Sequence, residues 1–248
     1  MGIKIIGTSH ISQQSSDQIE KEVKAHQPDI IAIELDVKRA LALSNKGETR
    51  RLALRDASKI GFKGYIFARV GQFMQKRLGE MVGVKPGSEM KTALRLAYKN
   101  KISIALIDQP IEITLNNFSR ELTWKEKLHF VSDIFRGVFF RKREIKRLGL
   151  DKLDLSKVPT DQLVEKLVDE LKVRYPNIHK TLVADRNKFM SQALLKIQTE
   201  NPGKDILAIV GAGHKHEMIN ILRKGLAKVD IKPYGKPWGD EIKHEDLG

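Results

Sequence analysis

The sequence contains no cysteine, and this absence excludes several kinds of site. Without thiols the chain cannot build a disulfide framework, a thiolate zinc site, an iron–sulfur cluster or a cysteine nucleophile. Any metal ion must therefore be held by histidine, aspartate and glutamate. The sequence also has no apolar run near the ~18 residues that span a bilayer, and its first six residues read as a strand rather than a signal peptide. These features favour a cytoplasmic protein, with a membrane-peripheral one as the alternative.

Aromatic residues are scarce, at 6% of the chain, whereas basic residues are abundant. The sequence has 45 Lys and Arg against 31 Asp and Glu, a formal net charge of +14, and such a surface attracts phosphate, RNA or anionic lipid. The few aromatics and the lack of a nucleic-acid-binding signature argue against a specific nucleic-acid partner. Residues 124–150 combine aromatic side chains with the basic cluster Arg141–Arg147. This segment predicts either weak contact with an anionic membrane surface or packing of a helix, and we favour packing.

Four segments that are apolar at nearly every position predict the strands of a parallel sheet. Such continuous runs are typical of strands covered by helices on both sides, and they occur at residues 3–6, 30–35, 102–108 and 205–210. Helical patterns lie between them, so the sequence predicts an α/β fold with a mainly parallel sheet of β–α units. We expect a single domain over residues 1–248, with large helical insertions at about 46–100 and 115–200, and a fifth strand at the sheet edge at 228–232.

Polar side chains follow three of these strands. His10 ends the motif Gly7-Thr-Ser-His10 after the first strand, Glu34 lies at the end of the second, and His214 ends Gly211-Ala-Gly-His214 after the fourth. Because ligands of open α/β sheets bind beyond the carboxyl ends of the strands, we expect these side chains to converge. A buried Glu34 would need a cation, a hydrogen-bond donor or a proton. The alternative is that Glu34 lies just past the buried section and touches water.

Two further charged residues lie at helical positions. Glu89, in Pro86-Gly-Ser-Glu89, falls in the first turn of an expected helix, where the helix dipole favours a carboxylate, and Ser88 is the expected cap. Simple capping is the alternative role for this acid. Arg186 lies in Asp185-Arg186-Asn187, and this polar triplet interrupts a helix with apolar residues at 182, 189 and 190. An arginine in such surroundings predicts a buried carboxylate or a bound anion as its partner. A surface salt bridge is the alternative for the arginine.

Taken in order, these motifs resemble those of the TraB/PrgY family, which is related to the Tiki metalloproteases, the GumN proteins and the erythromycin-esterase and ChaN-like proteins. The resemblance covers most of the chain and is carried by Gly7–His10, Ile33–Arg39, Pro86–Met90, Asp108 with Thr114, Asp185–Asn187 and Gly211–His214. It implies an α/β core with two β–α halves and a helical insert. For the Tiki branch it implies a divalent-metal-dependent peptidase, and for the TraB/PrgY branch the inhibition or inactivation of a peptide pheromone.

The resemblance also implies roles for five residues. His10 and His214 would be the motif histidines, Glu34 and Glu89 the motif acids, and Arg186 the motif arginine. The two histidines and two glutamates form a ligand set for a divalent metal such as Mn, Co, Zn or Fe. The glutamate that does not bind the metal would serve as the base for a water molecule. Arg186 would orient a substrate carboxylate or pair with a ligand glutamate.

Two functions are compatible with this site, and the effect of metal removal separates them. A divalent-metal-dependent peptidase or hydrolase should lose peptide cleavage on chelation. A non-catalytic protein that sequesters a peptide, as in pheromone shutdown, should keep its peptide. A peptide is the expected partner in both cases, and a homodimer is compatible with the sequence. The chain departs from many relatives at Gln109, where they have arginine, and many microbial relatives carry C-terminal membrane segments that are not among these 248 residues.

Overall fold

A four-stranded parallel sheet forms the centre of the fold. The computed structural model describes residues 2–8, 13–44, 87–126, 129, 132–133 and 161–225. The strands are β1 (Ile3–Thr8), β2 (Ile30–Ile33), β3 (Ser103–Leu106) and β4 (Ile206–Gly211), in the order β1-β4-β2-β3. All neighbouring strands are parallel, which confirms the α/β fold expected from the four apolar runs. The fifth strand expected at 228–232 lies outside the described residues.

The strands are apolar throughout because helices cover both faces of the sheet. In β2, Ile31 and Ile33 pack in one apolar cluster, whereas Ile30 and Ala32 pack in another. Successive side chains of a strand point to opposite faces, so β2 contributes to two cores at once. All six residues of β4 are also buried. The central position of β4 and β2 in the sheet explains why their sequences show no polar alternation.

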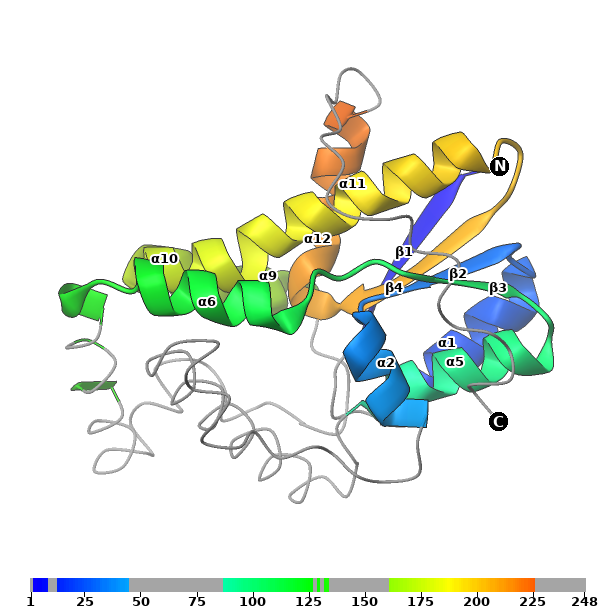
Figure 1. Ribbon diagram of the computed structural model, residues 1–248, viewed down its shortest axis with the longest axis horizontal. Helices are drawn as coiled ribbons and strands as arrows, with labels where there is room; N and C mark the ends of the chain where they lie inside the picture. Colours follow the sequence, from blue (N-terminus) through cyan, green and yellow to red (C-terminus); the bar gives the residue numbers. More distant parts are fainter. Residues whose placement is uncertain are drawn as a thin grey trace.

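The helices form one layer on each face of the sheet (Figure 1). On one face, α1 (Gln13–His26), α2 (Val37–Ser44) and α5 (Ser88–Lys99) contribute to the same apolar cluster. On the other face, α11 (Asp185–Glu200) and α12 (Ala212–Gly225) pack with Met190, Leu194, Met218 and Leu222 buried against the strands. The sheet therefore has an apolar core on each side, and its polar chemistry is confined to its ends.

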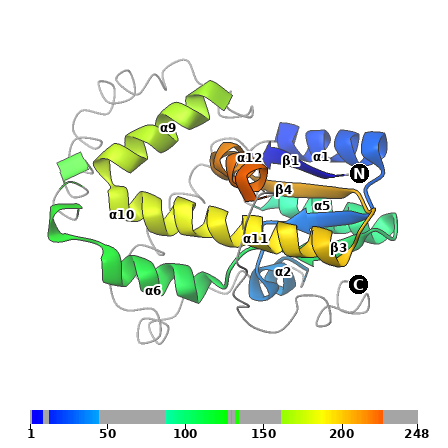
Figure 2. The same cartoon turned by 90° about the horizontal axis from the view of Figure 1, so that it is seen from above.

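Further helices lie beyond the carboxyl end of the sheet (Figure 2). They are α6 (Ile111–Glu121), α9 (Asp161–Arg174) and the short α10 (Pro176–His179). A π-helix, η3 (Lys180–Ala184), joins α10 directly to α11. The described residues between 111 and 200 are thus almost wholly helical, and they surround the edge where the sequence places the polar side chains.

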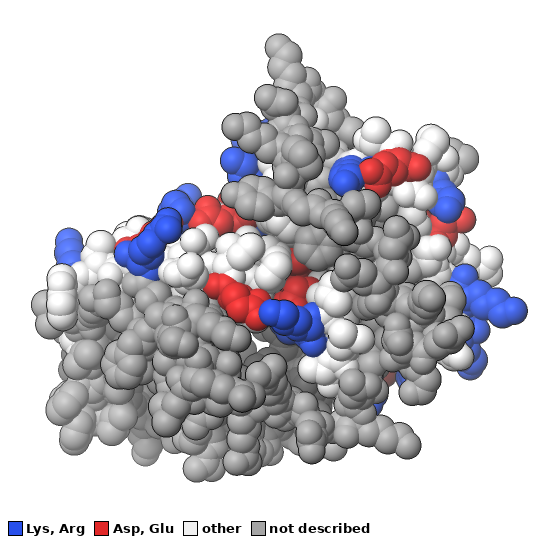
Figure 3. Space-filling view, in the orientation of Figure 1, with Lys and Arg blue, Asp and Glu red and all other residues white. Residues whose placement is uncertain are grey.

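Basic side chains on the described surface are interspersed with acidic ones (Figure 3). Examples are the ion pairs Lys4–Glu22 and Lys38–Glu112, both at 2.6 Å between nitrogen and oxygen. Exposed pairs of this kind contribute about 0–1 kcal/mol to stability. None of the described helices is long and apolar enough to cross a bilayer. Most of residues 124–150, including Arg141–Arg147, lies outside the described residues, so its packing and its membrane contact stay predictions.

Gly7 lies where β1 approaches the start of α12, and its lack of a side chain allows this approach. A Cβ atom at Gly7 would lie 3.1 Å from the backbone Cα of Ala212. We expect Gly7→Ala to lower the free energy of unfolding by about 1–3 kcal/mol, as other overpacking substitutions do, measured by urea denaturation. Gly2→Ala is the matched control, because a Cβ there has nothing within 4 Å. Equal stability of the two variants would contradict this expectation.

Candidate functional site

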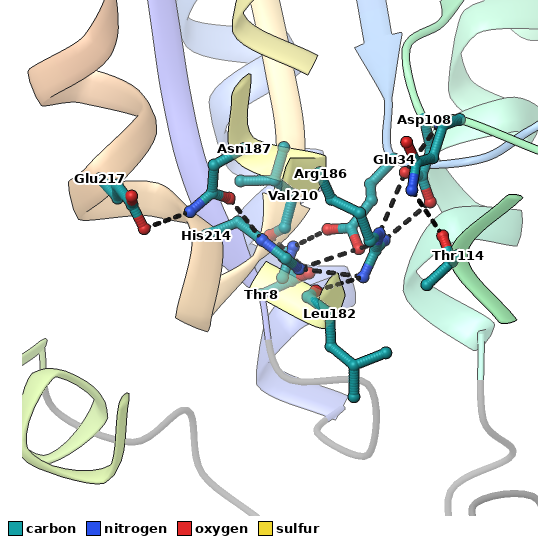
Figure 4. A network of polar contacts seen from close by, with 12 residues as sticks. Thr8, Glu34, Asp108, Thr114, Leu182, Arg186, Asn187, Val210, His214 and Glu217 are labelled. Carbon is teal, nitrogen blue, oxygen red and sulfur yellow. Dashed lines mark hydrogen bonds and ion pairs between the residues drawn. The ribbon is translucent and has the colours of Figure 1, made fainter. Parts of the chain in front are cut away.

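Arg186, in the first turn of α11, is the centre of a buried polar cluster at the carboxyl end of the sheet (Figure 4). Its guanidinium donates to the carboxylate of Glu34. It also donates twice to Asp108, from Nε to Oδ1 at 3.1 Å and from Nη2 to Oδ2 at 2.7 Å. Burial by itself would lower the pKa of Arg186, but the charges of Glu34 and Asp108 outweigh that effect and raise the pKa above its ordinary value. Arg186 is therefore a permanent buried cation.

Glu34 follows β2, and its carboxylate joins α11 to the end of β4. One oxygen accepts a hydrogen bond from Arg186, and Oε2 accepts one from the backbone N–H of Gly211 at 2.5 Å. The side chain is 2% exposed, so the alternative that Glu34 touches water is wrong. Gly211 directly precedes α12, where the helix dipole favours a negative charge. Glu34 thus has both the cation and the donor that its burial requires.

A second arginine, Arg39 of α2, binds the cluster from the other side. Its Nη1 donates to Oδ2 of Asp108 at 2.8 Å, and its Nη2 donates to the backbone carbonyl of Glu34 at 3.2 Å. The backbone N–H of Arg39 donates to Oδ1 of Asp36 at 2.9 Å, so Asp36 caps α2. Burial raises the pKa of Asp36, against the lowering effect of Arg39. Arg186 and Arg39 therefore balance the negative charges of the acids that follow β2 and of Asp108, which follows β3.

His214 lies in the first turn of α12, and both ring nitrogens have partners. Nδ1 is 2.6 Å from Oδ1 of Asn187, whose Nδ2 donates to Oε2 of Glu217 at 2.7 Å. Nε2 lies 3.2 Å from Nη1 of Arg186 and 3.4 Å from Oε1 of Glu34. The parallel sheet thus brings His214 and Glu34 together, although they come from different strand ends. The imidazole therefore connects the ionic cluster of Arg186 and Glu34 with Asn187 and, through it, with Glu217.

The π-helix η3 leads directly into the turn that carries Arg186. A π-helix is rare and often occurs at functional sites, because its extra residue changes the direction of the side chains that follow. Nη1 of Arg186 donates to the carbonyl of Leu182, within η3, at 3.3 Å. The next residue, Asn187, is fully buried and faces α12. Arg186 thus binds the carboxylates, and the next residue of α11, Asn187, binds His214.

The structure brings together three of the five residues that the sequence nominated: Glu34, Arg186 and His214. Glu89 lies in the first turn of α5, as expected, and is fully buried there, and none of the contacts described above involves it. The expected capping by Ser88 is wrong. The residue that precedes α5 is Gly87, whose backbone is left-handed, and no side chain caps the helix. His10 lies outside the described residues, so its convergence on this site stays a prediction.

The arrangement of the described side chains does not by itself form a metal centre. Among the residues that the structure describes, no group of three or more His, Asp and Glu is placed to hold a metal ion. The guanidinium of Arg186 contacts both Glu34 and Nε2 of His214. A cation that bridges these two side chains would meet this positive charge at close range. The metal-ligand role of His10, Glu34, Glu89 and His214 thus stays a prediction, and the described part of the set does not fit it.

Three further members of the cluster are Asp108, Asn187 and Glu217. Asp108 and Asn187 lie in motifs that carry the family resemblance, but the sequence assigned them no role, and Glu217 was only a secondary candidate ligand on the helix of His214. Asp108 comes just after β3, so the same strand-end argument that selects Glu34 would have selected it. Asn187 and Glu217 carry no such signal, because their contact depends on how α11 packs against α12. Their part in the site can be seen only in the folded chain.

Known proteins resemble this chain along most of its length. An uncharacterized protein of Methanocaldococcus jannaschii is 35% identical over 225 residues, which cover 90% of this chain and 53% of that protein. The TraB domain-containing proteins of mouse and human are 24% and 23% identical over 205 residues, which cover 77% of this chain and 51% of each relative. The chain therefore spans about half the length of these relatives. The sequence model of the TraB/PrgY/gumN family matches residues 2–230, and the chain belongs to that family.

Proposed function

We propose that this chain is a peptide hydrolase of the TraB/Tiki type, with the Arg186 cluster as its active site. The contact of Arg186 with both Glu34 and His214, at the edge of the sheet where α/β proteins bind ligands, carries the proposal. A buried charged cluster is a costly way to stabilise a fold, since apolar residues of similar size often serve as well. Its position and its composition therefore support a chemical role.

The contacts suit a division of roles among these side chains. In this proposal Nε2 of His214 takes a proton from a water molecule or from a substrate group. Nη1 of Arg186, which faces that nitrogen at 3.2 Å, is a donor for a carbonyl oxygen that becomes negative during hydrolysis. Glu34 and Asp108 hold the guanidinium in place. In this division Glu34 positions Arg186, and His214 rather than a glutamate is the base.

Sequestration of a peptide without cleavage is the second candidate function. It is favoured by the saturation of the two carboxylates, which are bonded to protein donors at every oxygen. In Asp108, Oδ1 accepts from Arg186 and from the backbone of Gln109, and Oδ2 accepts from Arg186 and Arg39. A closed network of this kind also suits a rigid binding surface.

A peptide-cleavage assay of the purified chain tests both functions. The protein is incubated with a mixture of synthetic peptides in the presence of Mn²⁺, Co²⁺, Zn²⁺ or Fe²⁺, or with EDTA, and new peptide ends are identified by mass spectrometry. We expect cleavage, and its loss in EDTA would support the predicted metal ion. Peptide retention without cleavage under every condition would support sequestration instead. If the chain neither cleaves nor retains any peptide, both functions are contradicted.

A further inference from the structure

We infer that Glu217 and Asn187 are positioning residues that hold the imidazole of His214 in one tautomer, with the proton on Nδ1 and the lone pair on Nε2. The three side chains form a continuous line of contacts that ends at Arg186 (Figure 4). The tautomer follows from the hydrogen-bonding capacity of the groups at the two ends of this line.

The first end is Glu217, whose carboxylate oxygens accept hydrogen bonds. Oε2 of Glu217 is 2.7 Å from the amide nitrogen of Asn187, which is the donor end of that side chain. The amide oxygen of Asn187 must then point the other way, and it lies 2.6 Å from Nδ1 of His214. Because an amide oxygen only accepts, the proton between these atoms belongs to Nδ1.

The second end is Arg186, whose guanidinium has only donors. Its Nη1 lies 3.2 Å from Nε2 of His214, so this ring nitrogen must be the acceptor. Oε1 of Glu34, 3.4 Å from Nε2, is an acceptor that an Nε2–H ring would use if Asn187 no longer bound Nδ1. The Asn187 end therefore selects the tautomer, and the nearer contact with Arg186 agrees with it.

Helix packing holds this line of contacts in place. Asn187 lies in the first turn of α11, and Glu217 lies one turn after His214 on α12, on the same side of the helix. Burial lowers the pKa of His179, in α10, and the negative charge of Glu217 opposes that effect. Glu217 itself is half-buried, and it holds the fully buried Asn187 from the outer side of the site.

The consequence is that Nε2, the nitrogen beside Arg186 and Glu34, carries the lone pair that a general base needs. This catalytic use of the lone pair rests on the proposed function, whereas the tautomer itself does not. A hydrogen-bond partner on the far ring nitrogen is the usual way in which proteins select the reactive one.

The tautomer can be measured by NMR of the full chain labelled with ¹⁵N-histidine, because long-range ¹H–¹⁵N spectra distinguish Nδ1–H from Nε2–H rings. His214→Gln identifies the signals of His214. We expect the Nδ1–H form in the wild-type protein and its loss in Asn187→Leu, which has no acceptor. Asn187→Asp should restore it, because a carboxylate accepts as the amide oxygen does. Glu217→Gln should populate both tautomers, since a glutamine can accept from Asn187 or donate to it.

The matched control is Glu165→Gln. Glu165 of α9 pairs at 3.0 Å with His216, which lies on the same helix as His214 but outside the line of contacts. This variant should leave the His214 signals unchanged. An Nε2–H ring in the wild-type protein would overturn the inference even if no variant folded, as would an unchanged tautomer in folded Asn187→Leu and Glu217→Gln. A chain that cleaves no peptide but keeps the Nδ1–H ring would contradict only the proposed function.

Discussion

Arg186→Met is expected to lower the free energy of unfolding by about 3–5 kcal/mol, the range found when one partner of a buried ion pair is removed. The variant would leave Glu34 and Asp108, which are 2% and 1% exposed, without their shared donor. Methionine has a similar length and an apolar end, so the loss of packing is small beside the loss of charge. Arg39 still contacts Asp108, but it reaches only the backbone of Glu34. The carboxylate of Glu34 would keep the hydrogen bond from the Gly211 N–H but lose its contact with a cation.

Urea denaturation of Arg186→Met and of a matched variant, Arg95→Met, measures this effect. Arg95 pairs with Glu20 at 3.0 Å on the surface, where the two side chains are 67% and 39% exposed. Its replacement should cost no more than about 1 kcal/mol. Arg186→Lys should fall between the two, because lysine keeps the charge but not the planar fork that reaches two carboxylates. Similar stability of Arg186→Met and Arg95→Met would show that the ionic cluster does not hold the sheet edge together.

The core of this fold could be predicted from the sequence because β2 and β4 are buried on both faces. A strand such as Ile30–Ile33 must then be apolar at every position, and that pattern is visible without a structure. The same reasoning located Glu34 and His214, since parallel strands end at one edge of the sheet. A buried carboxylate was one of the partners expected for Arg186, beside a bound anion or a surface salt bridge, and Glu34 is such a carboxylate. These are properties of single segments or of the direction of strands.

The remaining features depend on distances that sequence patterns do not contain. Arg186 meets Glu34 across 152 positions of the chain, and nothing in either segment specifies the other. The contact of Glu217 with Asn187 likewise depends on the packing of α12 against α11. The cap of α5 also depends on the backbone, because the left-handed Gly87 begins the helix and Ser88 does not cap it. Contacts across the fold decided the first two cases, and the backbone conformation decided the third.

Glu34→Gln is expected to reduce peptide cleavage by about 100-fold per folded molecule, within the range typical of lost acid–base or electrostatic assistance. The two oxygens of Glu34 accept from different donors, Arg186 and the N–H of Gly211. A glutamine has one acceptor oxygen and one donor nitrogen, so one of these contacts must place a donor against a donor. An amide nitrogen that faces Arg186 would displace the guanidinium from His214. An amide nitrogen that faces the N–H of Gly211 would move the start of α12.

The same substitution should also lower the free energy of unfolding by about 1–3 kcal/mol, the cost of a buried polar group left without a suitable partner. If the buried carboxylate of Glu34 had no partner, its removal would instead be neutral or stabilising. The pairing of Glu34 with Arg186 removes that reason. Thermal unfolding with and without added metal ion, and turnover per folded molecule, must therefore be measured on the same samples.

Glu20→Gln is the matched control, because it makes the same change in an exposed pair with Arg95 and should alter neither quantity appreciably. A Glu34→Gln protein that is less stable but turns over normally when folded would assign Glu34 to the scaffold and leave His214 and Arg186 to carry the chemistry. A protein that is stable but inactive would give Glu34 a direct part in the reaction. Loss of metal-dependent stabilisation in this variant alone would favour the predicted ligand role, because the amide removes the negative charge that a divalent cation binds.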